Sequence, residues 1–180
     1  APEHVATEVT KLMGKPGCSE YVKFVTAFNK INKKLGKEQY LILYFISAHP
    51  GSSLKSSVEL AEFVRDQMQY YPEQVQNFTP TPMTISTSMY HTGLNPLNGK
   101  EVYVPINTWE RKAQRALLQY RNRSNHSLVC EALEKCGRTD LIGSSRKALV
   151  KENTFATKRK PSQNKKSHKT EQKPKRGKSK

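Results

Sequence analysis

Cysteine, long apolar runs and acidic residues are all scarce in this chain of 180 residues. Its three cysteines, Cys18, Cys130 and Cys136, are odd in number and scattered, which argues against a disulfide framework, and no CxxC pair suggests a zinc site. No apolar run approaches the roughly 20 residues that a membrane-spanning helix needs. The start, Ala1-Pro2-Glu3-His4, has no initiator Met, basic segment or apolar segment, so it predicts no signal peptide and a cut within a longer polypeptide. We therefore expect a reducing, cytoplasmic setting without membrane contact.

The shortage of acidic residues leaves a formal net charge of +16, and this charge is distributed unevenly. Residues 151–180 hold 12 Lys and Arg against two Glu, whereas residues 1–150 hold 19 against 13 Asp and Glu. The tail contains almost nothing apolar, so it cannot offset the entropy of ordering and is predicted to be disordered. Two interpretations stay open. The tail could bind nucleic acid without sequence specificity, since no aromatic residue follows Phe155, or it could be a solvated segment that maintains solubility.

One apolar run, residues 40–46, organises the rest of the chain. It does not alternate with polar residues, which predicts an interior strand of a parallel sheet that is covered on both faces. The sequence His49-Pro50-Gly51 then turns the backbone, and Ser52 or Ser53 can cap the helix that follows. Strand, turn and capped helix are the first half of a βαβ unit, in which ligands bind at the loop after the strand.

Helical and strand patterns alternate around this run. Apolar residues at helical spacing predict helices over residues 5–13, 19–35 and 54–68, and residues 74–78 read as a short strand. This order is typical of a parallel α/β fold. Residues 83–106 look irregular, and a capping box at Asn107 and Glu110 starts a helix that is followed by another from Ser127 to Cys136. We expect these two helices to form a small, mainly helical appendage.

Seven motifs in register resemble the YgiQ-type radical SAM proteins, and the match runs through essentially all of residues 1–150. The motifs are Ala1-Pro2-Glu3-His4, Leu12-Met13-Gly14-Lys15-Pro16, Tyr44-Phe45-Ile46-Ser47-Ala48-His49-Pro50-Gly51, Gln74-Val75-Gln76-Asn77-Phe78, Met89-Tyr90-His91-Thr92-Gly93, Val102-Tyr103-Val104-Pro105 and Gly137-Arg138-Thr139-Asp140-Leu141-Ile142-Gly143. The resemblance implies a protein with a 4Fe-4S cluster, held by a CxxxCxxC loop, that cleaves S-adenosylmethionine to a 5′-deoxyadenosyl radical. The chain has no CxxxCxxC, so this piece should be inactive by itself.

The resemblance also implies the organisation of the chain. The fold class is α/β: residues 1–95 would be the late strands and helices of a radical SAM partial (β/α) barrel. Residues 96–150 would be a family-specific helical region, and residues 151–180 a disordered Lys-rich tail. The expected partner is the missing N-terminal part of the same polypeptide, and the expected cofactors of the full-length protein are the 4Fe-4S cluster and S-adenosylmethionine, with neither expected on this piece.

In such relatives the turn after the late strand lies beside the bound cofactor, which makes Ser47 and His49 candidate cofactor-binding residues. Glu3 and His4 would occupy the same end of the preceding strand, and Gln76 and Thr79 the same end of the next. The alternative is that these side chains cap helices or satisfy nearby backbone groups. The three cysteines are expected to be free thiols rather than cluster ligands, so no metal ligand is assigned.

The alternative to the radical SAM hypothesis is that the protein is a non-enzymatic module. The α/β part would then be a scaffold and the basic tail would bind nucleic acid.

Overall fold

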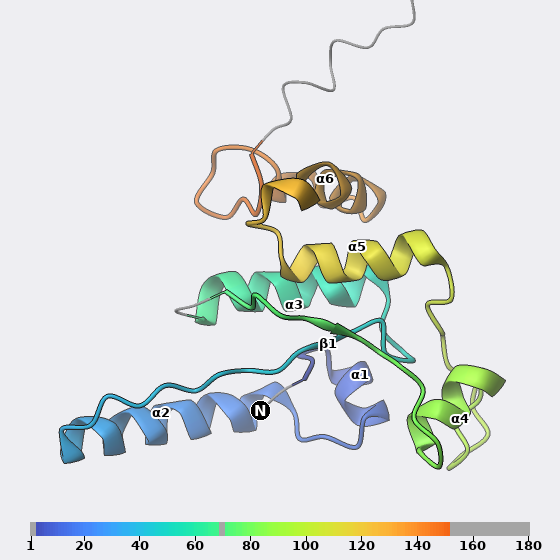
Figure 1. Cartoon of the computed structure of the whole chain (residues 1–180), viewed down its shortest axis with the longest axis horizontal. Coiled ribbons are helices and arrows are strands. Elements are labelled where there is room, and N and C mark those ends of the chain that lie inside the picture. Colours follow the sequence, from blue (N-terminus) through green and yellow to red (C-terminus); the bar gives the residue numbers. More distant parts are fainter. Residues whose placement is uncertain (1–2, 69–70, 152–180) are drawn as a thin grey trace, which may run out of the picture.

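The computed structural model describes residues 3–68 and 71–151. Its elements, in chain order, are α1 (Thr7–Leu12), α2 (Cys18–Leu35), β1 (Ile46–Ser47), α3 (Leu54–Gln67), β2 (Gln76–Asn77), α4 (Ile85–Thr92), α5 (Thr108–Leu118), the 3-10 turn η1 (Arg123–Asn125), α6 (His126–Lys135) and the 3-10 turn η2 (Thr139–Leu141). Helices and a small parallel sheet therefore mix in one fold, as the sequence predicts (Figure 1). A barrel is not visible in the described residues.

The sheet consists of β1 and β2, which run parallel with Ile46 opposite Gln76 and Ser47 opposite Asn77. The connection between them passes through α3, so β1, α3 and β2 form a βαβ unit. The expected strands, over residues 40–46 and 74–78, are thus much longer than those observed. Residues 40–45 instead run as an extended segment alongside α2 before reaching β1 (Figure 1).

The expectation that this extended segment is covered on both faces is wrong for the described structure. Leu43 and Phe45 are buried, with Phe45 at 0% exposure, whereas Tyr40, Ile42 and Tyr44 are exposed, Ile42 to 83%. Alternate side chains of an extended chain point to opposite faces. One face therefore packs on the helices, while the other, bearing Tyr40, Ile42 and Tyr44, is open; we call it the open face.

The core lies on the helical side of the sheet. In Figure 1, α3, α5 and α6 follow one another away from β1, and these helices share one hydrophobic cluster. Val58, Ala61 and Val64 of α3 meet Ala113 and Leu117 of α5, and Val129 and Leu133 of α6 complete the same cluster. Helices that the sequence assigns to an appendage are thus packed directly over the βαβ unit.

Two helices differ from the sequence expectations. Residues 85–92 form α4 in a stretch expected to be irregular, with the hydroxyl of Thr84 accepting from the backbone of Thr87 as an N-cap. On α2, apolar side chains at helical spacing, which usually face a core, are partly open, since Phe24, Ile31 and Leu35 are exposed. The end of α2 is as predicted, because Gly36 adopts the left-handed conformation with φ of 60°.

Candidate functional site

The turn after β1 has an unusual backbone. Ala48 is fully buried and has φ of +58°, a left-handed conformation that a residue with a Cβ atom rarely adopts. Gly51 has φ of +90°, and a Cβ atom there would lie 2.2 Å from Cδ1 of Leu12 on α1. Ser53 is the N-cap of α3 and forms a capping box with Ser56. The turn is therefore fixed by its own conformation and by close packing.

His49 lies at the centre of this turn and is only 3% exposed. Its Nδ1 is 2.7 Å from the carbonyl oxygen of Pro50, and its Nε2 is 2.8 Å from the hydroxyl of Ser86 on α4. A carbonyl can only accept, so Nδ1 carries the proton and Nε2 accepts from Ser86. Burial lowers the pKa of His49 and so keeps its ring neutral. The bond to Pro50 and the charge of Glu3 raise this pKa but only partly offset the effect of burial.

Glu3 and His4, expected at the end of a strand that precedes residues 40–46, lie near this turn. His4 is 1% exposed, and its Nδ1 accepts from the backbone N–H of Ala6 at 3.1 Å. Burial, with a smaller contribution from His49, lowers the pKa of His4 to about 4. Glu3 forms an ion pair with Lys15 at 3.3 Å, and its carbonyl accepts from the N–H of Ile46 at 3.3 Å. The structure thus brings Glu3, His4 and His49 together.

The remaining predicted site residues differ in their exposure to solvent. Ser47 is buried and donates to Oδ1 of Asn77 at 2.6 Å. Thr79 is exposed and donates weakly to the carbonyl of Asn77 at 3.3 Å, and Gln76 is exposed next to the open face. The buried groups Ser47, His4 and His49 hydrogen-bond within the protein, whereas Gln76 and Thr79 remain accessible.

A groove runs along the open face, with a volume of about 730 Å³. Its walls come from the two extended segments that lead into β1 and β2, and they are formed by Tyr40, Ile42, Leu43, Tyr44, Tyr71, Pro72, Glu73, Gln74 and Gln76. Of the six predicted cofactor-binding residues, Gln76 contributes to this groove. The groove is largely apolar and aromatic, with amide groups at its β2 side.

Sequence reasoning missed Gln114 of α5, which is fully buried against the turn. Its Oε1 accepts from the N–H of Ala48 at 3.0 Å and from the hydroxyl of Ser52 at 2.7 Å. Its Nε2 donates to the carbonyl of Ser52 at 3.0 Å and to Oε1 of Glu110 at 3.2 Å. A single Gln within a charged helix gives no sequence signal that distinguishes it from a solvent-facing residue.

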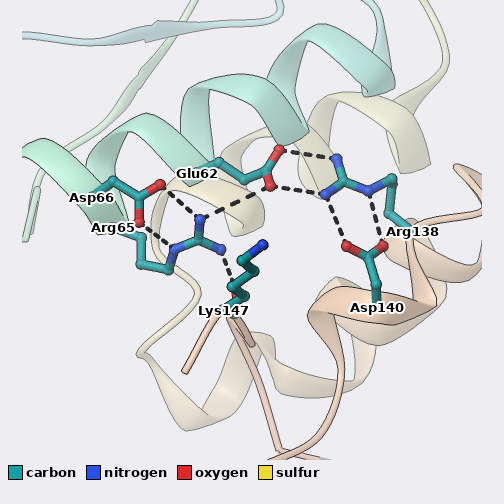
Figure 2. A network of polar contacts seen from close by, with 6 residues as sticks. All are labelled: Glu62, Arg65, Asp66, Arg138, Asp140 and Lys147. Atoms are coloured by element: carbon teal, nitrogen blue, oxygen red, sulfur yellow. Dashed lines mark hydrogen bonds and ion pairs between the residues drawn. The ribbon is translucent and has the colours of Figure 1, made fainter. Parts of the chain in front are cut away.

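A second polar network joins α3 to the segment after α6 (Figure 2). Arg138 binds Glu62 through two hydrogen bonds of 2.8 and 2.9 Å, and it binds Asp140 at 2.9 and 3.0 Å. Arg65 pairs with Asp66 at 2.7 Å and donates to the carbonyl of Lys147. The hydrogen bonds to Glu62 and Asp140 raise the pKa of Arg138, and Arg138 lowers the pKa of Asp140. Each charge faces a partner, so this network holds the fold together and is not a reactive site.

The described residues offer no place for an iron-sulfur cluster. Within residues 3–68 and 71–151, no group of three His, Cys, Asp or Glu could hold a metal ion. Cys18 on α2 and Cys130 and Cys136 on and after α6 are free, and burial raises the pKa of all three thiols. Because the sequence also lacks a CxxxCxxC, the cluster does not fit this chain.

Two further points concern surfaces and tail. Over the part of the chain that the structure describes, none of the helices has both the length and the apolar character needed to cross a membrane. The basic tail is predicted to span residues 151–180, and its predicted disorder and its two open roles, nucleic-acid binding or solubility, fall on residues 152–180, which lie outside the described residues.

Comparison with known proteins gives a consistent result. Residues 73–180 match the family described as "Domain of unknown function (DUF3362)". A UPF0313 protein of Methanocella arvoryzae is 56% identical over 165 residues, covering 92% of this chain and 27% of the relative. UPF0313 proteins of Methanosarcina mazei and Clostridium perfringens are 55% and 49% identical, covering 84% and 86% of this chain. The chain thus spans about a quarter of the length of these relatives. No solved structure matches it.

Proposed function

Because the chain belongs to the DUF3362 family and shares about half of its residues with UPF0313 proteins, we propose that it is the C-terminal part of a YgiQ-type radical SAM iron-sulfur protein. In the complete polypeptide this protein would cleave S-adenosylmethionine reductively. The observation that carries the proposal is the parallel βαβ unit, in which the turn after β1, at His49, is held in one conformation. Ligands of parallel α/β folds bind at this end of the strands.

The cluster and S-adenosylmethionine together would supply the radical chemistry, and the residues of this chain would contribute binding and positioning. Gln76 is the first residue of β2, not its last as expected, and Thr79 follows the strand; both are exposed and offer an amide and a hydroxyl to a polar ligand. Glu3, His4 and His49 lie together at the turn after β1, where burial lowers the pKa of both imidazoles and keeps them neutral. Neutral, internally bonded imidazoles would orient the turn and would not exchange protons with a ligand.

The open face gives the second part of the proposal. Ile42 and Tyr44 expose apolar surface beside the groove, although large exposed apolar patches are uncommon on a stable surface. We expect the N-terminal part of the same polypeptide to cover this face, so that the groove becomes the interior of the completed barrel. The three-quarters of the relatives' length that this chain does not match is ample for that cover.

The direct test is anaerobic reconstitution of the complete polypeptide with iron and sulfide, followed by an assay for 5′-deoxyadenosine. Formation of 5′-deoxyadenosine from S-adenosylmethionine under reducing conditions is expected. A reconstituted, folded protein that forms no cluster and no 5′-deoxyadenosine would refute the proposed activity.

A matched pair of variants tests the ligand role of the groove. Gln76→Leu should weaken binding of S-adenosylmethionine to the complete protein about tenfold, the value of one or two lost hydrogen bonds to a ligand. Gln74→Leu is the control, because Gln74 lines the same groove two residues farther from the strand end. Equal effects of the two substitutions would contradict a specific role for Gln76.

The cover of the open face has its own test. Tyr44→Asp should leave this chain folded, because Tyr44 is already 46% exposed here, but it should disrupt the complete polypeptide by placing a carboxylate in a buried interface. Hydrogen exchange of residues 40–46 should be slower in the complete polypeptide than in this chain. Equal exchange rates would show that the face stays open.

A further inference from the structure

The segment from Tyr103 to Gln114 lies outside the βαβ unit and hydrogen-bonds to the turn after β1. The N–H of Gly51 donates to the carbonyl of Tyr103 at 2.6 Å. Gln114 binds Ala48 on one side of His49 and Ser52 on the other. Residues separated by about 60 positions in the sequence thus enclose the turn between them. We call the hydrogen bonds from Tyr103 and Gln114 to this turn the clamp. Both residues lie within the stretch that matches DUF3362.

The orientation of the Gln114 amide is fixed by its neighbours. Its oxygen faces two donors, the N–H of Ala48 and the hydroxyl of Ser52, and its nitrogen faces two acceptors, the carbonyl of Ser52 and a carboxylate oxygen of Glu110. The other carboxylate oxygen of Glu110 accepts from the hydroxyl of Tyr103 at 2.5 Å. Reversing the amide would oppose donor to donor and acceptor to acceptor, so the network allows one arrangement.

This arrangement coincides with the least favourable backbone position of the turn. Ala48 is left-handed and fully buried, and it directly precedes His49. A left-handed conformation of a residue with a Cβ atom persists only where its surroundings determine it. The N–H of Ala48 donates to Gln114, so the peptide between Ser47 and Ala48 faces α5.

We propose that Gln114 is a positioning residue: it holds Ala48 left-handed and thereby presents His49 in one tautomer, with the Nε2 lone pair directed at Ser86. The role of the DUF3362 segment would then be to shape this turn from outside. That this turn borders a ligand rests on the proposed function; the clamp itself does not.

The test compares Gln114→Met with Gln119→Met in this chain. Methionine has a similar length but makes none of the four amide hydrogen bonds. Gln119 follows α5 on the same chain segment, and its side chain donates to the carbonyl of Glu73, away from the turn after β1. Long-range ¹⁵N–¹H correlation of the histidine side chains reports the His49 tautomer. Wild type and Gln119→Met should show the Nδ1-protonated form alone, and Gln114→Met should show a mixture of tautomers. An unchanged His49 spectrum in folded Gln114→Met would overturn the proposal.

A second variant covers the case in which Gln114→Met does not fold. Ala48→Gly removes the Cβ atom that makes the left-handed conformation unfavourable, so it should restore part of the lost structure in the Gln114→Met background. The double variant should therefore fold and show more of the Nδ1-protonated form than the single variant. No gain from Ala48→Gly would contradict a clamp that acts through Ala48.

Binding of S-adenosylmethionine to the complete polypeptide separates this proposal from the proposed function. If both hold, Gln114→Met should weaken binding about tenfold, because the turn beside the ligand is displaced, while Gln119→Met should not. A changed His49 tautomer with unchanged affinity would support the clamp and refute the placement of the cofactor at this turn.

Discussion

Gly51 is the position at which a single methyl group tests the packing of the turn after β1. Its φ of +90° is unfavourable for any residue with a Cβ atom, by about 1–2 kcal/mol. The added Cβ atom would also lie 2.2 Å from Cδ1 of Leu12, far inside the 3.5–4.0 Å of a normal carbon contact. Moving Leu12 away should cost roughly 1–3 kcal/mol more, as overpacking usually does. Gly51→Ala should therefore lower the free energy of unfolding by about 2–5 kcal/mol.

Gly93 supplies the matched control. It has φ of +67° at the end of α4, and a Cβ atom there would meet nothing within 4 Å. Gly93→Ala should therefore cost only the backbone part, about 1–2 kcal/mol. Urea unfolding followed by circular dichroism measures both values as shifts of the midpoint. In a Leu12→Ala background the cost of Gly51→Ala should fall toward that of Gly93→Ala. Equal costs for the two glycines, or no coupling to Leu12, would refute the reasoning.

Three further outcomes can be measured by the same unfolding assay. Phe45→Ala should cost about 3–5 kcal/mol and Ile42→Ala under about 0.5 kcal/mol in this chain; similar costs would contradict the observed burial pattern. Burial holds the pKa of His4 at about 4, below its unfolded value near 6.5, so the unfolded state binds the proton more readily. Stability should therefore fall as the pH drops from about 6.5 to 4, and His4→Gln should flatten this part of the profile. Arg138→Met should cost roughly 1 kcal/mol at low salt and less at 1 M NaCl, because its pair with Glu62 is partly exposed; a loss independent of salt would implicate packing.

Helix positions could largely be predicted from the sequence, because they depend on local signals. Gly36 ends α2 in the left-handed conformation, and Asn107 starts α5 by accepting from the backbone of Trp109 and Glu110. The capping box expected there is only half formed, since Glu110 bonds to Tyr103 and Gln114. Two side chains four and seven residues away thus replaced the backbone N–H of Asn107 as partners of Glu110, and the capping-box spacing does not reveal this.

The burial of residues 40–46 could not be predicted in the same way. A continuous apolar run is compatible with a strand covered on both faces, but the helices of the described chain cover only the face of Leu43 and Phe45. An apolar run shows that a segment can be buried, but whether one or both of its faces are covered depends on which other parts of the protein are present. The site residues follow the same rule: His49 could be placed at the turn from its sequence position, but its contact with Ser86 and the clamp by Gln114 depend on α4 and α5.

The turn after β1 and the open face therefore have different roles in the proposed function. At the turn, His4, Ser47 and His49 are buried and bonded, and Gln114 fixes the backbone that carries His49. On the open face, Gln76 meets a groove that is apolar and accessible. A ligand can reach the second group without displacing the first, because the buried groups already have partners. Gln114 and the buried side chains then hold the turn, and recognition falls to the exposed amide of Gln76 in the groove.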